Sequence, residues 1–215
     1  MGVRRHIHRI LSGTRMPEIY TPRLRLVPGT PAVLRAELES PEALGAALGA
    51  DVPASWPPEL YDADAVRYML GWAEAHPAEA AWGFYYILEA PPAGPNEGSA
   101  RPRAVGAGGY KGAPDAGGAV EIGYSVVPER QRRGYAREAV DGWLAHAFAD
   151  PRVSRVLAHT LAGLAPSIAV LRSAGFAFAG AGADPEEPSA VQYDLTREAY
   201  TAALEARHPV RVACA

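Results

Sequence analysis

The chain contains 215 residues, of which 48% are hydrophobic, and this length suits one globular domain with a sizeable core. Its formal net charge is only -3, so no global basic field would recruit nucleic acid or acidic lipid. Apolar stretches are interrupted well before membrane-spanning length, which argues against a membrane span and predicts a soluble, cytoplasmic protein.

The two ends of the chain are predicted to lie outside the folded domain. Residues 1–16 are rich in arginine and lack the apolar centre of a signal peptide, so we expect a basic, flexible extension. The two histidines in this segment are too few ligands for a stable metal site, and no bound metal is predicted. Residues 17–206 should form the domain, and residues 207–215 should form a tail that carries the single cysteine, Cys214.

Strands and helices separated by proline-rich breaks are predicted for the first half of the chain. Leu24 and Leu26 alternate with arginines, which is the period expected of a strand. Leu34, Leu38 and Leu44 recur at helical spacing and indicate one helix. The predicted elements are, in chain order, a strand at 18–28, a helix from 30 onward, a break at 49–58, a helix at 62–76, a strand at 82–89 and a loop at 91–102.

The second half is predicted to contain a hairpin, a long amphipathic helix and several shorter elements. Between residues 136 and 148 the apolar side chains form one continuous helical stripe, and Pro151 stops the helix. The predicted elements are strands at 104–110 and 119–127 joined by a turn at 112–118, a helix at 136–148, a strand at 153–160, a helix at 167–174, strands at 176–179 and 190–195, and a helix at 196–206. This mixed order predicts an α+β (mixed α/β) fold, in which helices flank a mostly antiparallel central sheet.

The start of the long helix is the most informative segment of the sequence. A helix N-terminus offers unpaired backbone N–H groups and a positive dipole end, and Gly134 would let a ligand approach the backbone closely. This combination suits a diphosphate, and four arginines add positive charge around it: Arg130, Arg132, Arg133 and Arg137. The alternative is an ordinary capped helix with a solvated arginine face.

Three segments in order resemble the GNAT superfamily of N-acetyltransferases. The pattern Q-x-x-G-x-A over residues 131–136 resembles the superfamily's pyrophosphate signature, with the required strand before it and helix after it. The segment 160–176 keeps the family's spacing, and the opening T-P-R-L-R-L over residues 21–26 is similar to the branch containing the ribosomal-protein alanine N-acetyltransferases. The resemblance implies the GNAT fold and transfer of an acetyl group from acetyl-CoA to a primary amine.

The resemblance also implies which residues bind acetyl-CoA. The backbone of Val126 and Val127 is expected to bind the pantetheine arm. The diphosphate is expected to lie on the signature segment, which consists of Gln131, Arg132, Arg133, Gly134, Tyr135 and Ala136, with Arg137 as support. Ser167 is expected either to contact the cofactor or only to cap the short helix that it begins.

Direct attack by a neutral amine requires a general base but no enzyme nucleophile. The resemblance makes Glu121, on the central strand, the first candidate, and partial burial is expected to raise its pKa; the alternative is a structural carboxylate paired with an arginine. His159, near the end of the next strand, is the second candidate, with a simply packed ring as the alternative. Leu164 and Leu171 occupy the positions where the family often carries asparagine and tyrosine, so the general acid is unassigned.

Acceptor selection is assigned to the first two helices, their connection and the strand that follows. Trp56 is expected either to wall an acceptor pocket or to plug the helix junction, and Tyr85 is expected to line the same pocket. The acceptor is expected to be a small-molecule amine or a protein N-terminus, with no nucleic-acid or membrane partner and with homodimerisation left open.

Two other classes of function compete with an active enzyme. Leu164 and Leu171 favour a catalytically weak acyl-CoA-binding sensor or interaction module. A nucleotide-binding protein of another fold is disfavoured, because the sequence has no G-x-x-x-x-G-K-[ST] motif. The glycine-rich residues 106–109 also fail the dinucleotide spacing, since Lys111 holds the sixth position.

Overall fold

In the computed structural model, the described residues are 17–59, 61–91, 100–182 and 188–207. The predicted basic extension, Cys214 and most of the proline-rich loop lie outside these ranges. Among the helices of the described part, none is both long and apolar enough to cross a bilayer.

An eight-stranded sheet runs through the described part of the chain in the order β1-β2-β3-β4-β5-β6-β8-β7. All neighbouring strands pair antiparallel except β5 and β6, which are parallel. The strands are β1 (Ile19–Tyr20), β2 (Leu24–Pro28), β3 (Phe84–Glu89), β4 (Arg103–Tyr110), β5 (Ala119–Val126), β6 (Arg155–Leu161), β7 (Ala177–Ala181) and β8 (Ala190–Thr196). The mostly antiparallel sheet that the sequence predicts is confirmed.

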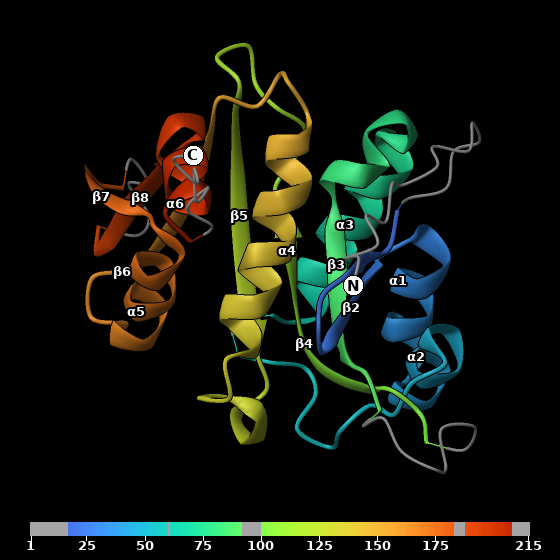
Figure 1. The fold of residues 1–215 in the computed structure, drawn as a ribbon. Helices are drawn as coiled ribbons and strands as arrows, with labels where there is room; N and C mark the ends of the chain where they lie inside the picture. Colours follow the sequence, from blue (N-terminus) through green and yellow to red (C-terminus); the bar gives the residue numbers. More distant parts are fainter. Residues whose placement is uncertain (1–16, 60, 92–99, 183–187, 208–215) are drawn as a thin grey trace, which may run out of the picture.

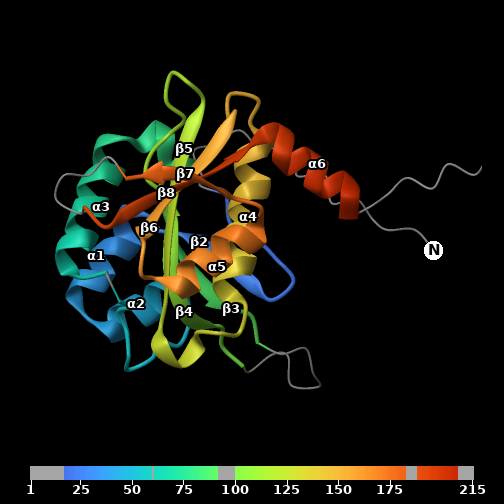
Figure 2. The same ribbon diagram turned by 90° about the vertical axis from the view of Figure 1, so that its left-hand side faces the viewer.

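Helices cover both faces of this sheet (Figure 1). Figure 2 shows α1, α2 and α3 on one face and α4 and α5 on the other. The helices are α1 (Pro31–Glu39), α2 (Pro41–Leu48), α3 (Ala63–Ala75), α4 (Tyr135–Ala149), α5 (Ala165–Ala174) and α6 (Arg197–Arg207), with short 3-10 helices η1 (Pro77–Trp82) and η2 (Pro128–Arg130). Two hydrophobic cores result, one between the sheet and α4 and one between the sheet and α1–α3.

Three predicted boundaries differ from the structure, each for a local reason. The single helix predicted from residue 30 is divided into α1 and α2, because Ser40 is extended and its side chain caps α2 by accepting a hydrogen bond from the Ala43 N–H. The first predicted strand is interrupted between β1 and β2, where Thr21 N–H bonds the Leu24 carbonyl. Trp82 belongs to η1 and packs in the core before β3 begins.

Close packing of α4 on the sheet depends on a glycine in β4. A Cβ atom placed on Gly108 would lie 2.4 Å from the Gly123 carbonyl oxygen and 2.8 Å from the ring of Trp143. Trp143 is fully buried at the centre of α4. The helix therefore lies directly against the strand because this position has no side chain.

Replacing Gly108 with alanine is expected to lower the free energy of unfolding by about 1–3 kcal/mol through overpacking. Gly71, inside α3, is the matched control, because a Cβ added there meets nothing within 4 Å. Gly71→Ala is expected to raise the free energy of unfolding by about 0.5–1 kcal/mol, since alanine favours the helix. Urea unfolding of both variants tests the assignment, and equal effects of the same sign would contradict it.

Candidate active site

The parallel strands β5 and β6 pair along only part of their length. Their register runs from Ala119 opposite Arg155 to Ile122 opposite Ala158. Both strands continue beyond the last pair, β5 to Val126 and β6 to Leu161, without further pairing to each other in the described residues. The backbones of the two strands therefore diverge, and the region between their unpaired segments is called the opening; β6 and α5 lie on one side of it and β5 and α4 on the other (Figure 1).

Backbone groups of β5 line this opening. The Val127 N–H donates to the Val105 carbonyl at 3.0 Å, so it points toward β4. Successive residues of a strand direct their backbone groups to alternate sides, and Val126 and Tyr124 therefore face the opening. The Val127 N–H is not available there, contrary to the prediction that grouped it with Val126. The side chain of Gln131 donates to the Val126 carbonyl at 3.1 Å, which ties the signature segment to the strand.

An anion-binding turn follows β5 and leads into α4. Arg132 has a φ of 60° and Gly134 a φ of 82°, and a positive φ is uncommon for a residue with a side chain. Glu138 N–H bonds the Gly134 carbonyl, but the N–H groups of residues 132–137 have no acceptor among the described residues. Consecutive free N–H groups at a helix N-terminus form a concave site for an anion.

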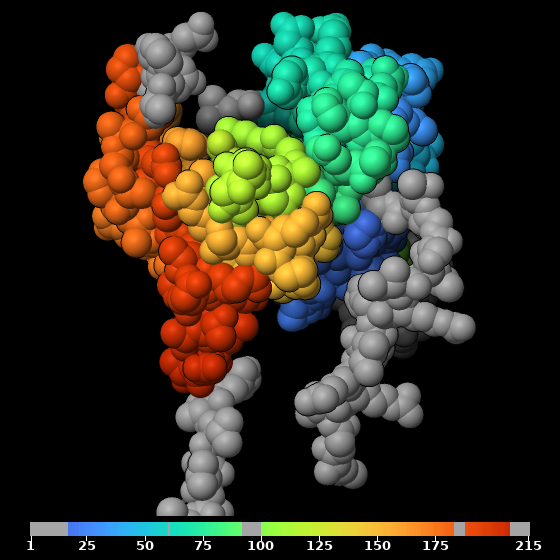
Figure 3. Space-filling view, turned by 90° about the horizontal axis from the view of Figure 1, so that it is seen from above, coloured from blue at the N-terminus to red at the C-terminus, as the bar shows by residue number. Residues whose placement is uncertain are grey.

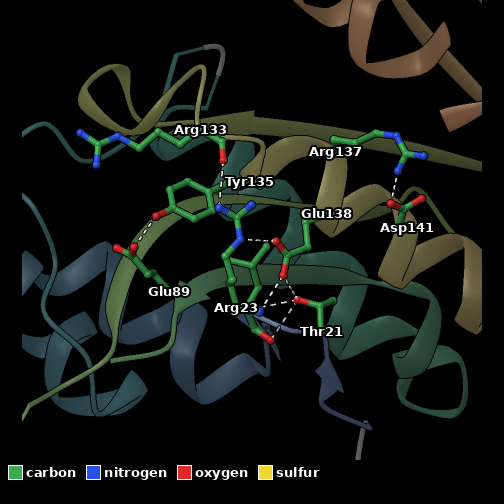
Figure 4. A network of polar contacts seen from close by, with 9 residues as sticks. Thr21, Arg23, Glu89, Arg133, Tyr135, Arg137, Glu138 and Asp141 are labelled. Carbon is green, nitrogen blue, oxygen red and sulfur yellow. Dashed lines mark hydrogen bonds and ion pairs between the residues drawn. The ribbon is translucent and has the colours of Figure 1, made fainter. Parts of the chain in front are cut away.

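The guanidinium of Arg23 also stands at this helix N-terminus (Figure 4). Its Nε donates to Glu138 at 2.7 Å and its Nη1 donates to the Arg133 carbonyl at 3.1 Å. It lies 4.9 Å over the Tyr135 ring, and its Nη2 is 3.2 Å from the place that a Cβ on Gly134 would occupy. The sequence pattern does not mark Arg23 as a site residue, although the motif at residues 21–26 contains it.

The arginines expected around the phosphate contribute unequally. Arg130 is paired with Glu89 at 3.1 Å, and Arg137 is paired with Asp141 and also bonds the Ser173 carbonyl. No ion pair of the Arg132 or Arg133 side chain is recorded within the described part of the chain. Arg23, Arg130 and Arg137 are therefore each partly neutralised by a carboxylate, and among the described residues the arginines near the turn without an ion pair are Arg132 and Arg133.

The two candidate bases lie together at the point where the strands separate. The Glu121 Oε1 accepts a hydrogen bond from the Lys111 ammonium and lies 3.0 Å from the Nδ1 of His159. Burial raises the pKa of Glu121, but the hydrogen bonds and charges of Lys111 and His159 outweigh it and leave the pKa below its ordinary value. The predicted raised pKa is therefore wrong, and the partners are lysine and histidine where the alternative expected an arginine.

Glu121 faces the side of the sheet covered by α1–α3. Its neighbours Val120 and Ile122 are buried in the core beneath α4, and side chains alternate along a strand. A cavity of about 930 Å³ lies on the same side and is lined by Lys111, by the β5 segment from Gly123 to Ser125, and by α3. Seen from above in Figure 3, the turn between β4 and β5 separates α3 and η1 from the C-terminal elements.

The acceptor residues predicted from sequence do not line this cavity. Tyr85 is fully buried on the α4 side, and its hydroxyl donates to the Ala81 carbonyl at 3.0 Å, so its predicted role is wrong. The Trp56 indole N–H donates to Glu37 at 2.6 Å and its ring stacks on Tyr86, which matches the alternative of a packing plug. The aromatic residues that do line the cavity are Tyr61, Tyr68, Trp72, Phe84, Tyr110 and Tyr124.

Across the opening, α5 meets β5 through one tyrosine. The Tyr124 hydroxyl donates to the Ser167 carbonyl at 3.3 Å and lies equally far from the Ser167 Oγ. Ser167 does not cap α5, because the helix begins at Ala165 and has no side-chain cap. Leu171 is buried in the core, and Leu164 lies at the N-cap position of α5.

Comparison with known proteins agrees with this geometry. The sequence matches the family model of the acetyltransferase (GNAT) domain over residues 32–177. No match was found among curated proteins. Because the family model spans most of the sequence, the chain belongs to the GNAT acetyltransferase family.

Solved structures share the fold at low sequence identity. RimJ of Mycobacterium smegmatis, in complex with a CoA-disulfide, is 18% identical with a TM-score of 0.60, covering 90% of this chain and 96% of its own. RimL, a ribosomal L7/L12 alpha-N-protein acetyltransferase in complex with coenzyme A, is 16% identical with a TM-score of 0.59, covering 85% and 99%. A GNAT-family acetyltransferase from Bacillus anthracis is 16% identical with a TM-score of 0.55, covering 85% and 99%.

Glu138 is expected to stabilise the anion-binding turn in a pH-dependent way. Burial raises its pKa, but hydrogen bonds from Thr21 and Arg23 outweigh this and lower the pKa below its ordinary value of 4.5. The stabilisation should therefore be present above pH 4.5 and be lost as the pH falls through the lowered folded-state value.

The test is Glu138→Gln, which we expect to lower the free energy of unfolding by about 1–2 kcal/mol at neutral pH. In urea unfolding the difference from the native protein should shrink when the pH is lowered to about 3. Glu74→Gln, in an exposed pair with Arg35, is the control and should change stability by less than about 0.5 kcal/mol. A difference that is independent of pH would contradict the assignment.

Proposed function

We propose that the protein transfers the acetyl group of acetyl-CoA to a primary amine by direct attack. The observation that carries this proposal is the opening between β5 and β6, which connects the anion-binding turn with the Glu121–His159 pair. Membership of the GNAT family and the CoA complexes of RimL and RimJ support acyl-CoA as the donor.

The donor is proposed to bind with its diphosphate on the N–H groups of residues 132–136, with Arg23 beside it. Its pantetheine arm would then run along Val126 in the way that a peptide adds a strand to an exposed edge. The thioester would reach the place beyond Ile122 and Ala158 where the strands separate. Ser167, which is close to Tyr124 on the far side of the opening, remains a proposed contact of the donor.

We assign the general base to His159, with Glu121 as its positioning residue. The carboxylate is 3.0 Å from Nδ1, which leaves Nε2 as the nitrogen that accepts the proton of the amine. The lowered pKa of Glu121 suits a carboxylate that stays charged and orients the imidazole. The amine nitrogen then forms the new bond to the acetyl carbon, and the carbon–sulfur bond breaks with the electron pair on sulfur.

The cavity beside α3 is proposed to hold the acceptor. Its lining is mainly apolar and aromatic, and Asp64 and Lys111 supply charged groups at its surface. An amine attached to an apolar body fits this lining, whether it is a small molecule or a protein N-terminus.

A CoA-binding module with little turnover is the second candidate, and burial of Leu171 favours it because no titratable group occupies that position. Release of free thiol from acetyl-CoA, measured with a panel of amines and N-terminal peptides, separates the two functions. Turnover with any acceptor supports the transferase, whereas tight CoA binding without turnover supports the module.

Gly134→Glu is expected to weaken coenzyme A binding by roughly 100-fold or more, since the side chain adds bulk and negative charge where the diphosphate would lie. Isothermal titration calorimetry with coenzyme A measures the effect. Gly71→Glu is the matched control, because it adds the same charge at an open site on α3 and should leave the affinity unchanged. Equal affinities of the Gly134 variant and the native protein would refute the diphosphate site.

His159→Gln is expected to lower kcat/KM by roughly 100-fold to 1,000-fold, because no base remains to accept the proton of the amine. Glu121→Gln should cause a smaller loss, about 10-fold, because the base is still present. Coenzyme A affinity should stay unchanged in both variants. The reverse pattern, in which Glu121→Gln is the more damaging change, would transfer the role of base to Glu121.

A further inference from the structure

The candidate active site contains the only lysine of the whole sequence. Of the 21 lysine and arginine residues in the chain, all but Lys111 are arginines. A guanidinium keeps its proton at every physiological pH, whereas the amine of a lysine can lose its proton and act as a nucleophile. Among the lysines and arginines of this protein, Lys111 is therefore the one whose nitrogen can accept an acetyl group.

Lys111 follows β4 and lies directly beside Glu121 on β5. Its backbone N–H donates to the Glu121 carbonyl at 2.9 Å, and residues that face each other across antiparallel strands direct their side chains to the same face of the sheet. The ammonium donates to Glu121 Oε1, the same atom that lies 3.0 Å from His159 Nδ1. One carboxylate oxygen therefore connects the nitrogen of Lys111 with the imidazole that we assign as the general base.

The stem of Lys111 crosses the point where the opening begins. Gly123 is the first residue of β5 beyond the last pair with β6, and a Cβ atom placed on it would lie 3.8 Å from the Lys111 Cε. Because Gly123 has no side chain, nothing on this residue stands between the lysine and the opening. The Lys111 side chain is 61% exposed and has a flexible four-carbon stem, so rotation about its terminal bonds moves the nitrogen from Glu121 toward the opening.

We propose, on the basis of the proposed acetyltransferase function, that the enzyme acetylates its own Lys111 when acetyl-CoA is bound and no acceptor fills the cavity. The ammonium first gives one proton to His159, and its nitrogen then forms a bond to the acetyl carbon. The carbon–sulfur bond breaks with the electron pair on sulfur, and the second proton that the nitrogen loses ends on the thiolate. Water removes the proton from the imidazolium, and the products are Nε-acetyl-lysine and free coenzyme A.

Acetylation of Lys111 would change the electrostatics of the site. Burial acts to raise the pKa of Glu121, whereas Lys111 and His159 together lower it. Acetylated Lys111 is neutral and no longer stabilises the charged carboxylate, so the pKa of Glu121 would rise. Lys111 also lines the cavity proposed for the acceptor, and this wall would lose a positive charge. The modification therefore alters both the partner of the base and the acceptor cavity.

Tryptic digestion and mass spectrometry test the proposal, because trypsin does not cleave after an acetylated lysine. The native protein is incubated with acetyl-CoA and no amine. The unmodified chain gives separate fragments 104–111 and 112–130, whereas acetylation of Lys111 gives one fragment, 104–130, that carries an acetyl group. An acetyl group on the α-amine of residue 1 appears in a different fragment. In Lys111→Arg, fragment 104–111 should stay separate and unmodified.

Matched variants separate self-acetylation from uncatalysed chemical acetylation. Gly134→Glu keeps Lys111 but weakens donor binding, so at an acetyl-CoA concentration below the native dissociation constant its labelling should be slower by roughly 100-fold. Gly71→Glu should be labelled at the native rate. His159→Gln should slow labelling by roughly 100-fold or more. The native rate constant should not depend on protein concentration, since the transfer is intramolecular.

Three results would overturn the proposal and leave the transferase function standing. They are equal labelling of the native protein and Gly134→Glu, a rate constant that rises with protein concentration, and an unmodified Lys111 in a protein that acetylates added amines. Coenzyme A binding with neither labelling of Lys111 nor turnover of any amine overturns both.

Discussion

The organisation of the site depends on one limit in backbone hydrogen bonding, namely that β5 and β6 stop pairing after Ile122 and Ala158. Each strand stays anchored on its other side, β5 by β4 and β6 by β8, so the unpaired ends cannot collapse toward each other. Backbone groups that would otherwise need a partner are left facing a gap, and such groups favour an extended ligand. This separation sets the positions of two features: the Glu121–His159 pair, where the strands begin to separate, and the anion-binding turn, which follows the end of β5.

Backbone N–H groups dominate one end of the opening, at the anion-binding turn, and charged side chains dominate the other end, around Glu121. At the turn, the proposed binding of the diphosphate relies on N–H groups held by local geometry, and arginine side chains only add to them. At the other end, three side chains form one cluster in which Glu121 is shared between Lys111 and His159. The carboxylate is thereby kept charged, which makes it a better orienting group than a proton acceptor at neutral pH.

Much of the fold and the donor half of the site follow from local sequence patterns, whereas the acceptor half does not. The turn around Gly134 is encoded within a few residues by a glycine and a helix start, and so it is predictable. Arg23 reaches this turn from 110 residues away in the sequence, and the pairing of Glu121 with His159 depends on the register of two strands. The sequence of β3 does not say which side chains lie beneath α4 and which beneath α1–α3, because both faces of the sheet are covered, and Tyr85 is therefore buried away from the cavity.

The contact between Arg23 and Glu138 joins parts of the chain that are made at different times during synthesis. The turn and α4 can form locally, but the guanidinium beside Gly134 arrives only when the segment preceding β2 docks against the first turn of α4. Trimming the chain from its N-terminus past Thr21 would therefore take away support from a site that is remote in sequence. The shortest fragment of the chain in which Arg23 still supports the anion-binding turn therefore begins before β2, even though that strand does not line the opening.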